Sequence, residues 1–441
     1  MPDSALELMP EDKAPSDAPE VEQGAPGEHS VRRSEWWQSS VVVTGEIMGT
    51  GVLSLPYACS RLGWVVGIGS SIGFGCTAMY AGNLLAFCKN RLYPDATSFA
   101  DLATATAGPR FGKFTRGVLM TCWASILPYY LVACSQSLAA AFPDVLCYWQ
   151  WCLVTMAVMA PIMQLRSFHL LSGVSALSTV AVVAVVALVV PGLVSSAPAA
   201  ATSSAGIPAG LPFLHVYSAL GSFVFAYQGQ SVMMEIMREM KTPAEFPKAL
   251  FAANGLMMLV YTSVTAVGYG TYGDAVAGFL PATLPPGALR SAVGVMLAFH
   301  TAVSYMLTAQ PLHRNVHIWL FPRTADAVRG REAAVHWAGI TLSFLLLAFF
   351  VANVVPFFAD FQDLLGNLFG APTVFGWPAY FYVRGCQKRG LPVPRRDLVL
   401  CGLFIFVFLP AFTLLGSVNS LLQIADDWQH EQAAPFQCTP V

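Results

Sequence analysis

The chain has 441 residues, of which 55% are hydrophobic and only 11% are charged. A soluble domain usually carries about a quarter charged residues, so this composition predicts a membrane protein. The formal net charge is −2 and there is no basic patch, which argues against a nucleic-acid partner.

The N-terminal tail, residues 1–36, is polar. Residues 1–35 hold nine acidic residues, three basic residues and five prolines, without the apolar core of a secretory signal. This composition predicts a disordered cytoplasmic tail. The following residues, 37–427, are expected to form one transporter domain, and 428–441 a short tail on the other side of the membrane.

Eleven apolar stretches of about 20 residues follow the tail, the length that crosses the hydrocarbon core of a bilayer. They are expected near 40–59, 62–88, 114–141, 147–164, 168–194, 213–236, 248–271, 289–312, 335–355, 359–382 and 398–424. The predicted fold class is therefore an all-α polytopic membrane protein with 11 transmembrane helices.

The first stretch predicts a helix that breaks in its middle. It carries Gly49, Gly51 and Pro56 in its centre, together with a carboxylate, Glu46. Hydrocarbon offers no hydrogen bonds to an unwound backbone, which is tolerated at membrane depth only inside protein or along a watery cavity. A broken first helix therefore indicates a cavity near the midplane, as in solute transporters.

The sixth stretch is interrupted in the same way, within residues 221–229. Two breaks five spans apart predict an inverted repeat with equivalent discontinuous helices in each half. The first repeat is expected at about 40–194 and the second at about 213–382, with the helix at 398–424 outside both.

The basic residues predict the orientation. With a cytoplasmic N-terminus, the odd-numbered connections hold only Arg61 and Arg290, and the tail and even connections hold the other 21 Lys and Arg residues. Positive residues are retained on the cytoplasmic side. The C-terminus is then extracellular or lumenal, and the plasma membrane is favoured over an endomembrane. Most of the ten cysteines fall inside apolar stretches, which predicts buried free thiols.

Four motifs resemble the amino acid/auxin permease family. They are Gly49–Ala58, Phe225–Met237 with Pro243 and Phe246–Lys248, Pro356–Gly366 and Gly416–Val418, in the order of that family's first, sixth, tenth and last helices. The resemblance implies a five-plus-five repeat of the leucine-transporter type. It implies transport of an amino acid, or of an indole auxin in one branch, usually by proton symport across the lipid bilayer.

The two breaks match the two charges of an amino acid. The amides of Thr50, Gly51 and Val52 begin a half-helix, whose positive dipole end suits a carboxylate. Gly49 and Gly51 let the ligand approach the backbone, or alternatively only pack helices closely. Carbonyls at Phe225, Ala226 and Tyr227 suit the ammonium. Phe223, Phe225 and Tyr227, with Tyr129 or Tyr130, are the candidate contacts to the side chain of the substrate.

Three ionisable groups are expected at membrane depth, namely Glu46, Glu235 and His300. Such groups mark functional sites by default, and here they are candidates for proton coupling. Glu235 is alternatively a partner of Arg238. Sodium is the alternative ion, bound near hydroxyls such as Thr301 and Ser304. Sodium-coupled relatives tend to carry Asn at the position of Gly45, which favours the proton.

Two other classes of function compete with a transporter. His313 and His317 lie on one helix face and suggest a membrane metalloenzyme, but no third ligand accompanies them and catalytic metals need at least three. We therefore expect no enzyme activity, no metal and no cofactor. A sensor that binds an amino acid without moving it is the second alternative.

Overall fold

The computed structural model describes residues 34–164, 168–198, 201–208, 213–325, 330–430, 436 and 438. Most of the predicted disordered tail, residues 1–33, lies outside these residues, as does most of the C-terminal tail. The described residues are overwhelmingly helical. The β structure recorded among them is one isolated parallel bridge between Ser34 and Met240.

The first predicted span is a broken helix, as the sequence indicated. Helix α1 (Trp36–Ile47) ends before Met48 and Gly49, and the chain resumes in a tight turn, η1 (Thr50–Ser54), that leads into α2 (Leu55–Phe87). Helix α2 contains the second predicted span as well. The two spans meet at Gly63, whose φ of 74° reverses the chain and is readily reached only by glycine.

The sixth predicted span is broken at the corresponding place. Helix α7 (Phe213–Ala226) is followed by an unwound stretch at 227–229, the turn η3 (Gln230–Val232) and the short helix α8 (Met233–Glu239). The prediction of discontinuous first and sixth helices is therefore confirmed.

The other spans are helical at their predicted places. Spans three to five and seven to nine correspond to α4 (Pro109–Ala141), α5 (Tyr148–Ile162), α6 (Phe168–Ser195), α9 (Phe246–Tyr272), α11 (Ala288–Leu320) and α13 (Arg331–Val354). The tenth comprises α14 (Phe358–Leu365), the wide turns η6 (Gly366–Gly370) and η7 (Pro372–Gly376), and α15 (Trp377–Lys388). The eleventh comprises α16 (Arg395–Leu403), η8 (Phe404–Phe408), η9 (Ala411–Gly416) and α17 (Ser417–His430).

Short elements connect these spans. They are η2 (Cys88–Leu92), α3 (Phe99–Ala107), η4 (Pro243–Glu245), η5 (Gly273–Ala275), α10 (Leu280–Thr283) and α12 (Pro322–Ala325). Within the described ranges, seven helical stretches are both long and apolar enough to cross a membrane unaided. The remaining four predicted spans are the two broken helices, the 15-residue α5, and the tenth span, which begins with two aspartates.

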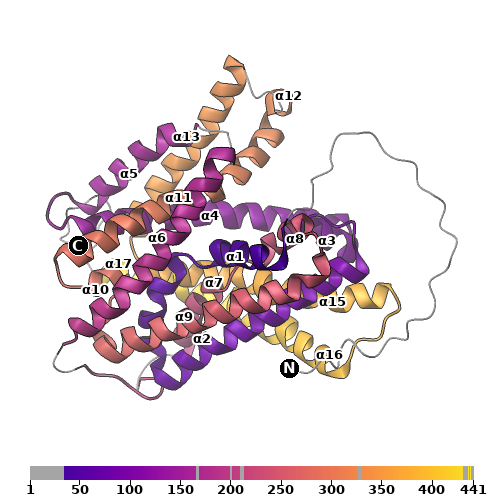
Figure 1. The fold of residues 1–441 in the computed structure, drawn as a ribbon, viewed down its shortest axis with the longest axis horizontal. Coiled ribbons are helices and arrows are strands. Elements are labelled where there is room, and N and C mark those ends of the chain that lie inside the picture. The colour runs from indigo at the N-terminus through magenta and orange to yellow at the C-terminus, as the bar shows by residue number, and fades with distance from the viewer. Residues whose placement is uncertain are drawn as a thin grey trace.

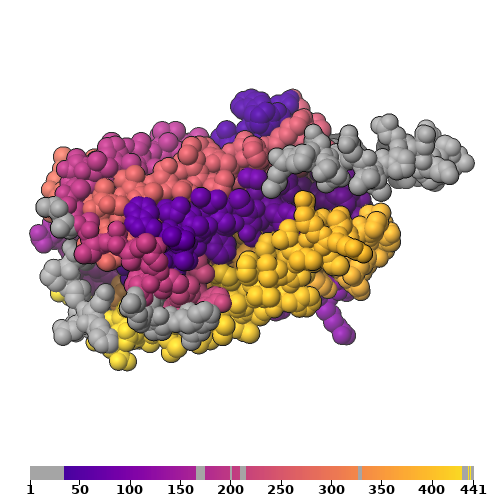
Figure 2. All heavy atoms as spheres, turned by 90° about the horizontal axis from the view of Figure 1, so that it is seen from below, coloured from indigo at the N-terminus to yellow at the C-terminus, as the bar shows by residue number. Residues whose placement is uncertain are grey.

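The two breaks are buried in the bundle at Thr50, Gly51 and Tyr227, whereas α1 exposes Trp37, Val41 and Val42 at the surface. Figure 1 shows α1 and α7 in its middle, with α2, α6 and α9 around them. Helix α4 packs along α11, and α2 along α9. The C-terminal span, yellow in Figure 2, forms an outer band along one face. Phe406 and Val399 in this band are 78% and 70% exposed, as suits side chains that face lipid.

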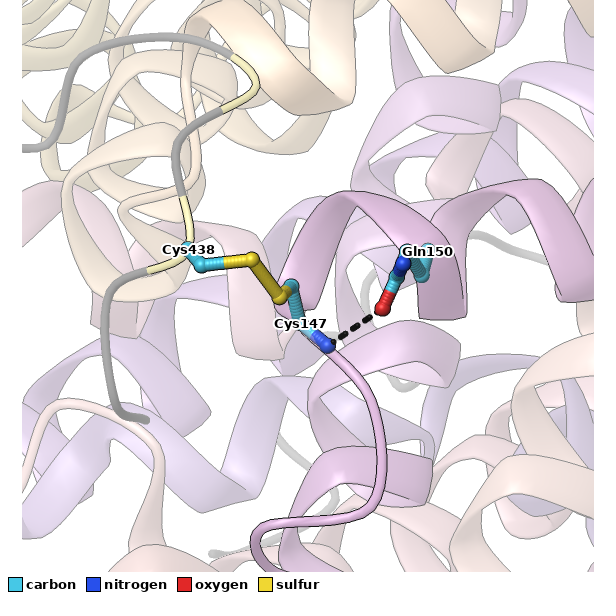
Figure 3. Close-up of a disulfide and its surroundings, with 3 residues drawn as sticks. All are labelled: Cys147, Gln150 and Cys438. Atoms are coloured by element: carbon cyan, nitrogen blue, oxygen red, sulfur yellow. Dashed lines mark hydrogen bonds between the residues drawn. A yellow bond between two sulfur atoms is a disulfide. The ribbon is translucent and has the colours of Figure 1, made fainter.

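A disulfide joins Cys147, at the start of α5, to Cys438 in the C-terminal tail, 291 residues later (Figure 3). The Cys147 amide also donates to Gln150 Oε1 at 2.9 Å. Nothing in the cysteine spacing indicated this pair, because it depends on where the tail lies in the folded chain. Of the eight free cysteines, all but Cys76 are buried.

Candidate functional site: a cavity at the two helix breaks

A cavity of about 470 Å³ lies against both breaks. The first broken helix contributes Gly45, Glu46, Gly49, Thr50 and Gly51, and the second contributes Phe225, Ala226, Gln228, Gly229 and Ser231. Helix α4 contributes Leu119, Cys122, Trp123, Ile126 and Tyr130, and α11 contributes His300, Ser304, Leu307, Thr308 and Pro311. The cavity thus lies where the sequence predicted one.

The cavity reaches the surface at one end. Val42, 47% exposed, and the exposed Glu239 line it there, near the start of α1 and the end of α8. At this mouth the chain before α1 is tied to the end of α8. The Ser34 amide donates to the Glu239 carbonyl at 3.2 Å, and the Lys241 amide donates to the Ser34 carbonyl at 2.9 Å. The two half-helices at the mouth are therefore linked through their backbones.

The first break presents the beginning of a half-helix to the cavity. Gly49 caps η1 with φ −128° and ψ −148°, and no side chain caps the turn. The first amides of a helix have no partner within it. Those of Thr50 and Gly51 are therefore available beside the cavity, which both residues line. Val52, the third predicted residue, is buried and does not line the cavity.

The second break presents backbone carbonyls. The Gln228 amide donates to the Phe225 carbonyl at 3.0 Å, which closes a turn and occupies one lone pair of that oxygen. Phe225 and Ala226 line the cavity. Tyr227 does not, because its buried side chain points away and donates from its hydroxyl to the Ser71 carbonyl at 2.9 Å.

The glycines of the breaks differ in role. A Cβ at position 51 would lie 3.1 Å from the Ala226 Cα, and a Cβ at 229 would overlap the Ile47 side chain. These two glycines let the broken helices touch. A Cβ at 49 would meet only the His300 Nε2, at 3.7 Å. Gly49 therefore borders open space, and the two roles considered from the sequence divide between different glycines.

His300 presents one ring nitrogen to the first break. Its Nδ1 lies 3.1 Å from the Ser178 carbonyl and 2.9 Å from the Ser178 hydroxyl. A carbonyl oxygen can only accept, so Nδ1 carries the hydrogen and Nε2 of the neutral ring is an acceptor. Nε2 has no partner among the described residues, although the side chain is only 4% exposed.

The predicted carboxylates also line the cavity. Glu46 lies one turn before the break, is accessible from the cavity and forms no ion pair or hydrogen bond within the described part of the chain. Glu235 lines the cavity from α8, and its buried Oε2 has no hydrogen-bond partner there. Ser304, a predicted sodium ligand, is also part of the lining. Thr301 is not, since its hydroxyl donates to the Leu297 and Ala298 carbonyls.

Two predicted aromatic contacts lie behind the wall of the cavity. Phe223 and Tyr129 are fully buried, and it is the neighbouring Tyr130 that lines the cavity. The Tyr129 hydroxyl accepts from Thr50 at 3.1 Å and donates to Gln362 at 2.9 Å. The Gln362 amide in turn donates to the Gly51 carbonyl at 3.0 Å. Tyr129 therefore holds the unwound chain in place.

A buried ion cluster lies beyond the break, at the end of the first broken helix. Arg61 Nη1 lies 3.0 Å from Asp363 and 3.4 Å from Asp360, and its Nη2 donates to Gln423. All three charged side chains are at most 10% exposed. Ser222, from α7, donates to Asp363 as well. The cluster ties the first, sixth, tenth and eleventh helices together.

The sequence reasoning missed this cluster. Asp360 and Asp363 fall within the predicted tenth span, so the three ionisable groups expected at membrane depth were too few. Both are ionisable residues inside an apolar stretch, the signal that singled out Glu46. The cation that they contact, Arg61, is 299 and 302 residues away in the chain. The sequence therefore offered the signal for the aspartates but not for the pairing.

The broken helices, the central cavity and the lipid-facing outer band define an integral membrane transporter. The fold is that of two solved transporters. MhsT in complex with L-phenylalanine superposes with a TM-score of 0.52 and 14% identity, over 86% of this chain and 98% of that one. A Na⁺-coupled sialic acid symporter superposes with a TM-score of 0.50 and 11% identity, over 88% of this chain and 90% of that one. Both confirm the predicted five-plus-five fold of the leucine-transporter type.

The chain belongs to the family described as transmembrane amino acid transporter protein, whose model matches residues 32–421. Amino acid transporter AVT1C of Arabidopsis thaliana is 24% identical over 90% of this chain and 71% of its own length. The N amino acid transport system protein of Neurospora crassa is 22% identical over 96% of this chain and 91% of its own length. The vesicular GABA transporter of Caenorhabditis elegans is 24% identical over 87% of this chain and 80% of its own length.

These relationships confirm the resemblance inferred from the four motifs. They support amino acid transport as the function and membrane embedding as the location, and they place the chain among transporters rather than enzymes. The histidine pair that suggested a metalloenzyme lies on α11, where the buried His313 packs against the rings of Trp337 and Phe344.

Proposed function

We propose that this protein carries an amino acid across its membrane together with a proton, by alternating access to the cavity at the two breaks. The observation that carries the proposal is the coincidence of three features in one cavity. These are the free amides of a half-helix, the carbonyls of a second break, and two acceptors without a hydrogen-bond partner among the described residues, the Glu46 carboxylate and His300 Nε2.

The substrate would lie between the breaks. Its carboxylate would accept from the amides of Thr50 and Gly51, where the helix dipole favours a negative charge. Its ammonium would donate to the carbonyls of the second break at Ala226, or to Nε2 of His300. An indole acid lacks the ammonium and brings only a negative charge to a cavity that already holds carboxylates. An amino acid is therefore favoured over an auxin.

The proton would bind at Glu46, with His300 and Glu235 as further proton-accepting groups in the same lining. Glu46 lies one turn from the substrate amides, so that its charge would be felt by the bound ligand. A sodium site would draw on Ser304 and Thr301, but of these two hydroxyls only that of Ser304 lines the cavity. The local geometry therefore favours the proton over sodium.

The orientation that we propose has a cytosolic N-terminus and an extracellular or lumenal C-terminus. The distribution of Lys and Arg supports it. The disulfide supports it independently, because Cys147 and Cys438 would both lie on the non-cytosolic side, where disulfides persist. The cavity mouth at Val42 and Glu239 would then face the cytosol. The opposite side would be closed by the ion cluster around Arg61.

The purified full-length chain in proteoliposomes provides the test. Each amino acid and one indole acid would be offered as a radiolabelled solute, with a pH dye inside. We expect accumulation driven by an inward proton gradient, with acidification tied to uptake, and no accumulation driven by sodium alone. Glu46→Gln should abolish the pH dependence of uptake while leaving some ligand binding. Accumulation on a sodium gradient would overturn proton coupling, and binding without uptake would indicate a sensor.

A further inference from the structure

The charges that line the cavity have one sign. Glu46, Glu235 and Glu239 line it, and among the described residues of the lining there is no Lys or Arg. Arg238, which neighbours the second of these carboxylates in the chain, is exposed and is not part of the lining. A cavity with this lining attracts cations and repels anions.

The acceptors of the cavity exceed what the backbone of a substrate needs. In the binding mode proposed above, either the carbonyls of the second break or His300 Nε2 would accept from the ammonium, so at least one of these acceptors is left over. The exposed Glu46 carboxylate, which lines the cavity, forms no ion pair among the described residues, and the buried Glu235 Oε2 and His300 Nε2 have no hydrogen-bond partner there. A polar atom buried without a partner costs free energy. Donors on the bound ligand would remove that cost.

One wall of the cavity suits a long cationic side chain. Trp123, Tyr130, Leu119 and Ile126 line the cavity from α4. Apolar side chains pack against the methylene stem of a lysine or arginine, and the faces of aromatic rings attract its charged head. Glu46 and Tyr130 line the same cavity, so the carboxylate and this wall border the same space.

We propose that the cavity also accepts amino acids with a positively charged side chain, and that this charge binds Glu46 in place of the coupling proton. The proposal rests on the transport function proposed above. With a neutral amino acid, Glu46 would carry a proton. With lysine or arginine, the side chain would neutralise Glu46, and no proton would be needed there. In both cases one positive charge would cross the membrane in each cycle, whereas acidic amino acids would be excluded.

The test compares lysine with norleucine, which has the same four-carbon side chain without the terminal amine. Proteoliposomes containing the full chain would be assayed for uptake, internal pH and current. We expect norleucine uptake to acidify the interior and lysine uptake to carry current without acidification. We also expect lysine, but not glutamate, to compete with norleucine. These measurements use the unmodified protein and do not depend on any variant folding.

Glu46→Gln provides the second arm. It should weaken lysine binding roughly ten- to hundredfold, the strength of a hydrogen bond to a charged group, and should weaken norleucine binding by a smaller factor. Glu245→Gln is the matched control, because it removes the same charge from a residue that pairs with Lys248 outside the cavity. It should leave the affinities for both substrates unchanged.

The outcomes separate the two proposals. Proton-coupled uptake of norleucine without uptake of or competition by lysine would overturn the inference and leave the transport function intact. Lysine uptake that acidifies the interior as norleucine uptake does would overturn the replacement of the proton. Uptake of no amino acid would overturn the transport function and this inference with it.

Discussion

Gly51 and Ala226 hold the two helix breaks in direct contact: a Cβ on Gly51 would stand 3.1 Å from the Ala226 Cα. That distance is tighter than ordinary packing, and the opposing atom belongs to the backbone, which cannot swing aside. The contact sets the spacing between the amides of one break and the carbonyls of the other. The binding geometry for both ends of an amino acid therefore depends on this one glycine.

Alanine substitutions at the first break should separate packing from binding. Gly51→Ala should destabilise the protein by about 1–3 kcal/mol, the usual effect of overpacking, and abolish uptake. Gly49→Ala meets only His300 Nε2, at 3.7 Å, and should keep the stability but weaken substrate affinity. Thermal unfolding in detergent and uptake kinetics measure these effects. Equal melting temperatures for the two variants would contradict the division of roles.

The buried ion cluster should be costly to break. Arg61→Gln leaves Asp360 and Asp363 buried without their cation, and removing one partner of a buried pair typically costs about 3–5 kcal/mol. Arg116→Gln is the control, because its 3.8 Å pair with Asp101 is exposed and should contribute less than about 1 kcal/mol. Chemical denaturation of both variants gives the difference. A small effect for Arg61→Gln would show that the cluster does not hold the four helices together.

The tautomer of His300 predicts a large effect on uptake for one substitution and a small effect for another. His300→Ala removes the Nε2 acceptor and should abolish most uptake. Ser178→Ala keeps the backbone carbonyl that accepts from Nδ1, and loses only the hydroxyl at 2.9 Å. It should cost about 1 kcal/mol, or roughly fivefold in KM. Uptake kinetics of the two variants measure this. If Ser178→Ala reduced uptake as much as His300→Ala, the serine hydroxyl rather than the carbonyl would fix the tautomer of the His300 ring.

The disulfide makes a prediction about orientation. Cys147→Ser frees Cys438, and Cys438→Ser frees Cys147. Each variant should react with a membrane-impermeant maleimide added to the non-cytosolic side of sealed vesicles, and the wild type should not react there. Loss of the disulfide should also destabilise the protein by about 2–5 kcal/mol. Labelling only from the cytosolic side would reverse the proposed orientation.

The cap of α3 predicts a pH dependence of stability outside the membrane. Burial alone would raise the pKa of Asp101, but hydrogen bonds from Thr97 and Ser98 outweigh it and hold the pKa below its ordinary value. The Asp101 side chain accepts from the Thr97 hydroxyl at 2.7 Å and from the Ser98 amide at 3.0 Å. A carboxylate with a lowered pKa stabilises the folded state above its unfolded pKa, and this is lost as the pH falls through the folded value.

Asp101→Asn should therefore lower stability by about 1 kcal/mol near neutral pH, the usual value of a helix cap. The difference in stability between the variant and the wild type should decrease as the pH falls through the acid range. It should vanish below the pKa of Asp101 in the folded state. Melting temperatures measured in detergent between neutral and acid pH test this. A gap that is independent of pH would show that the ionised form of Asp101 is not what stabilises the cap.

The sequence alone determined the helical spans, the two breaks and the family. Each depends on local properties. A span requires about 20 apolar residues in a row, and a break requires glycine or proline where backbone groups must be satisfied by a cavity. Glu46 and His300 could be singled out for the same reason, since an ionisable residue in an apolar stretch is visible in the sequence.

Only the tertiary structure decided which side of each helix faces the cavity and which distant residues meet. In a soluble protein the polar face of a helix is solvated, which identifies the opposite, apolar face as the buried one. Within a membrane, lipid and protein interior are equally apolar, so this signal is absent. Tyr130 therefore lines the cavity where Tyr129 does not. The pairing of Arg61 with Asp363 and of Cys147 with Cys438 joins residues about 300 positions apart, and only the closure of the bundle brings them together.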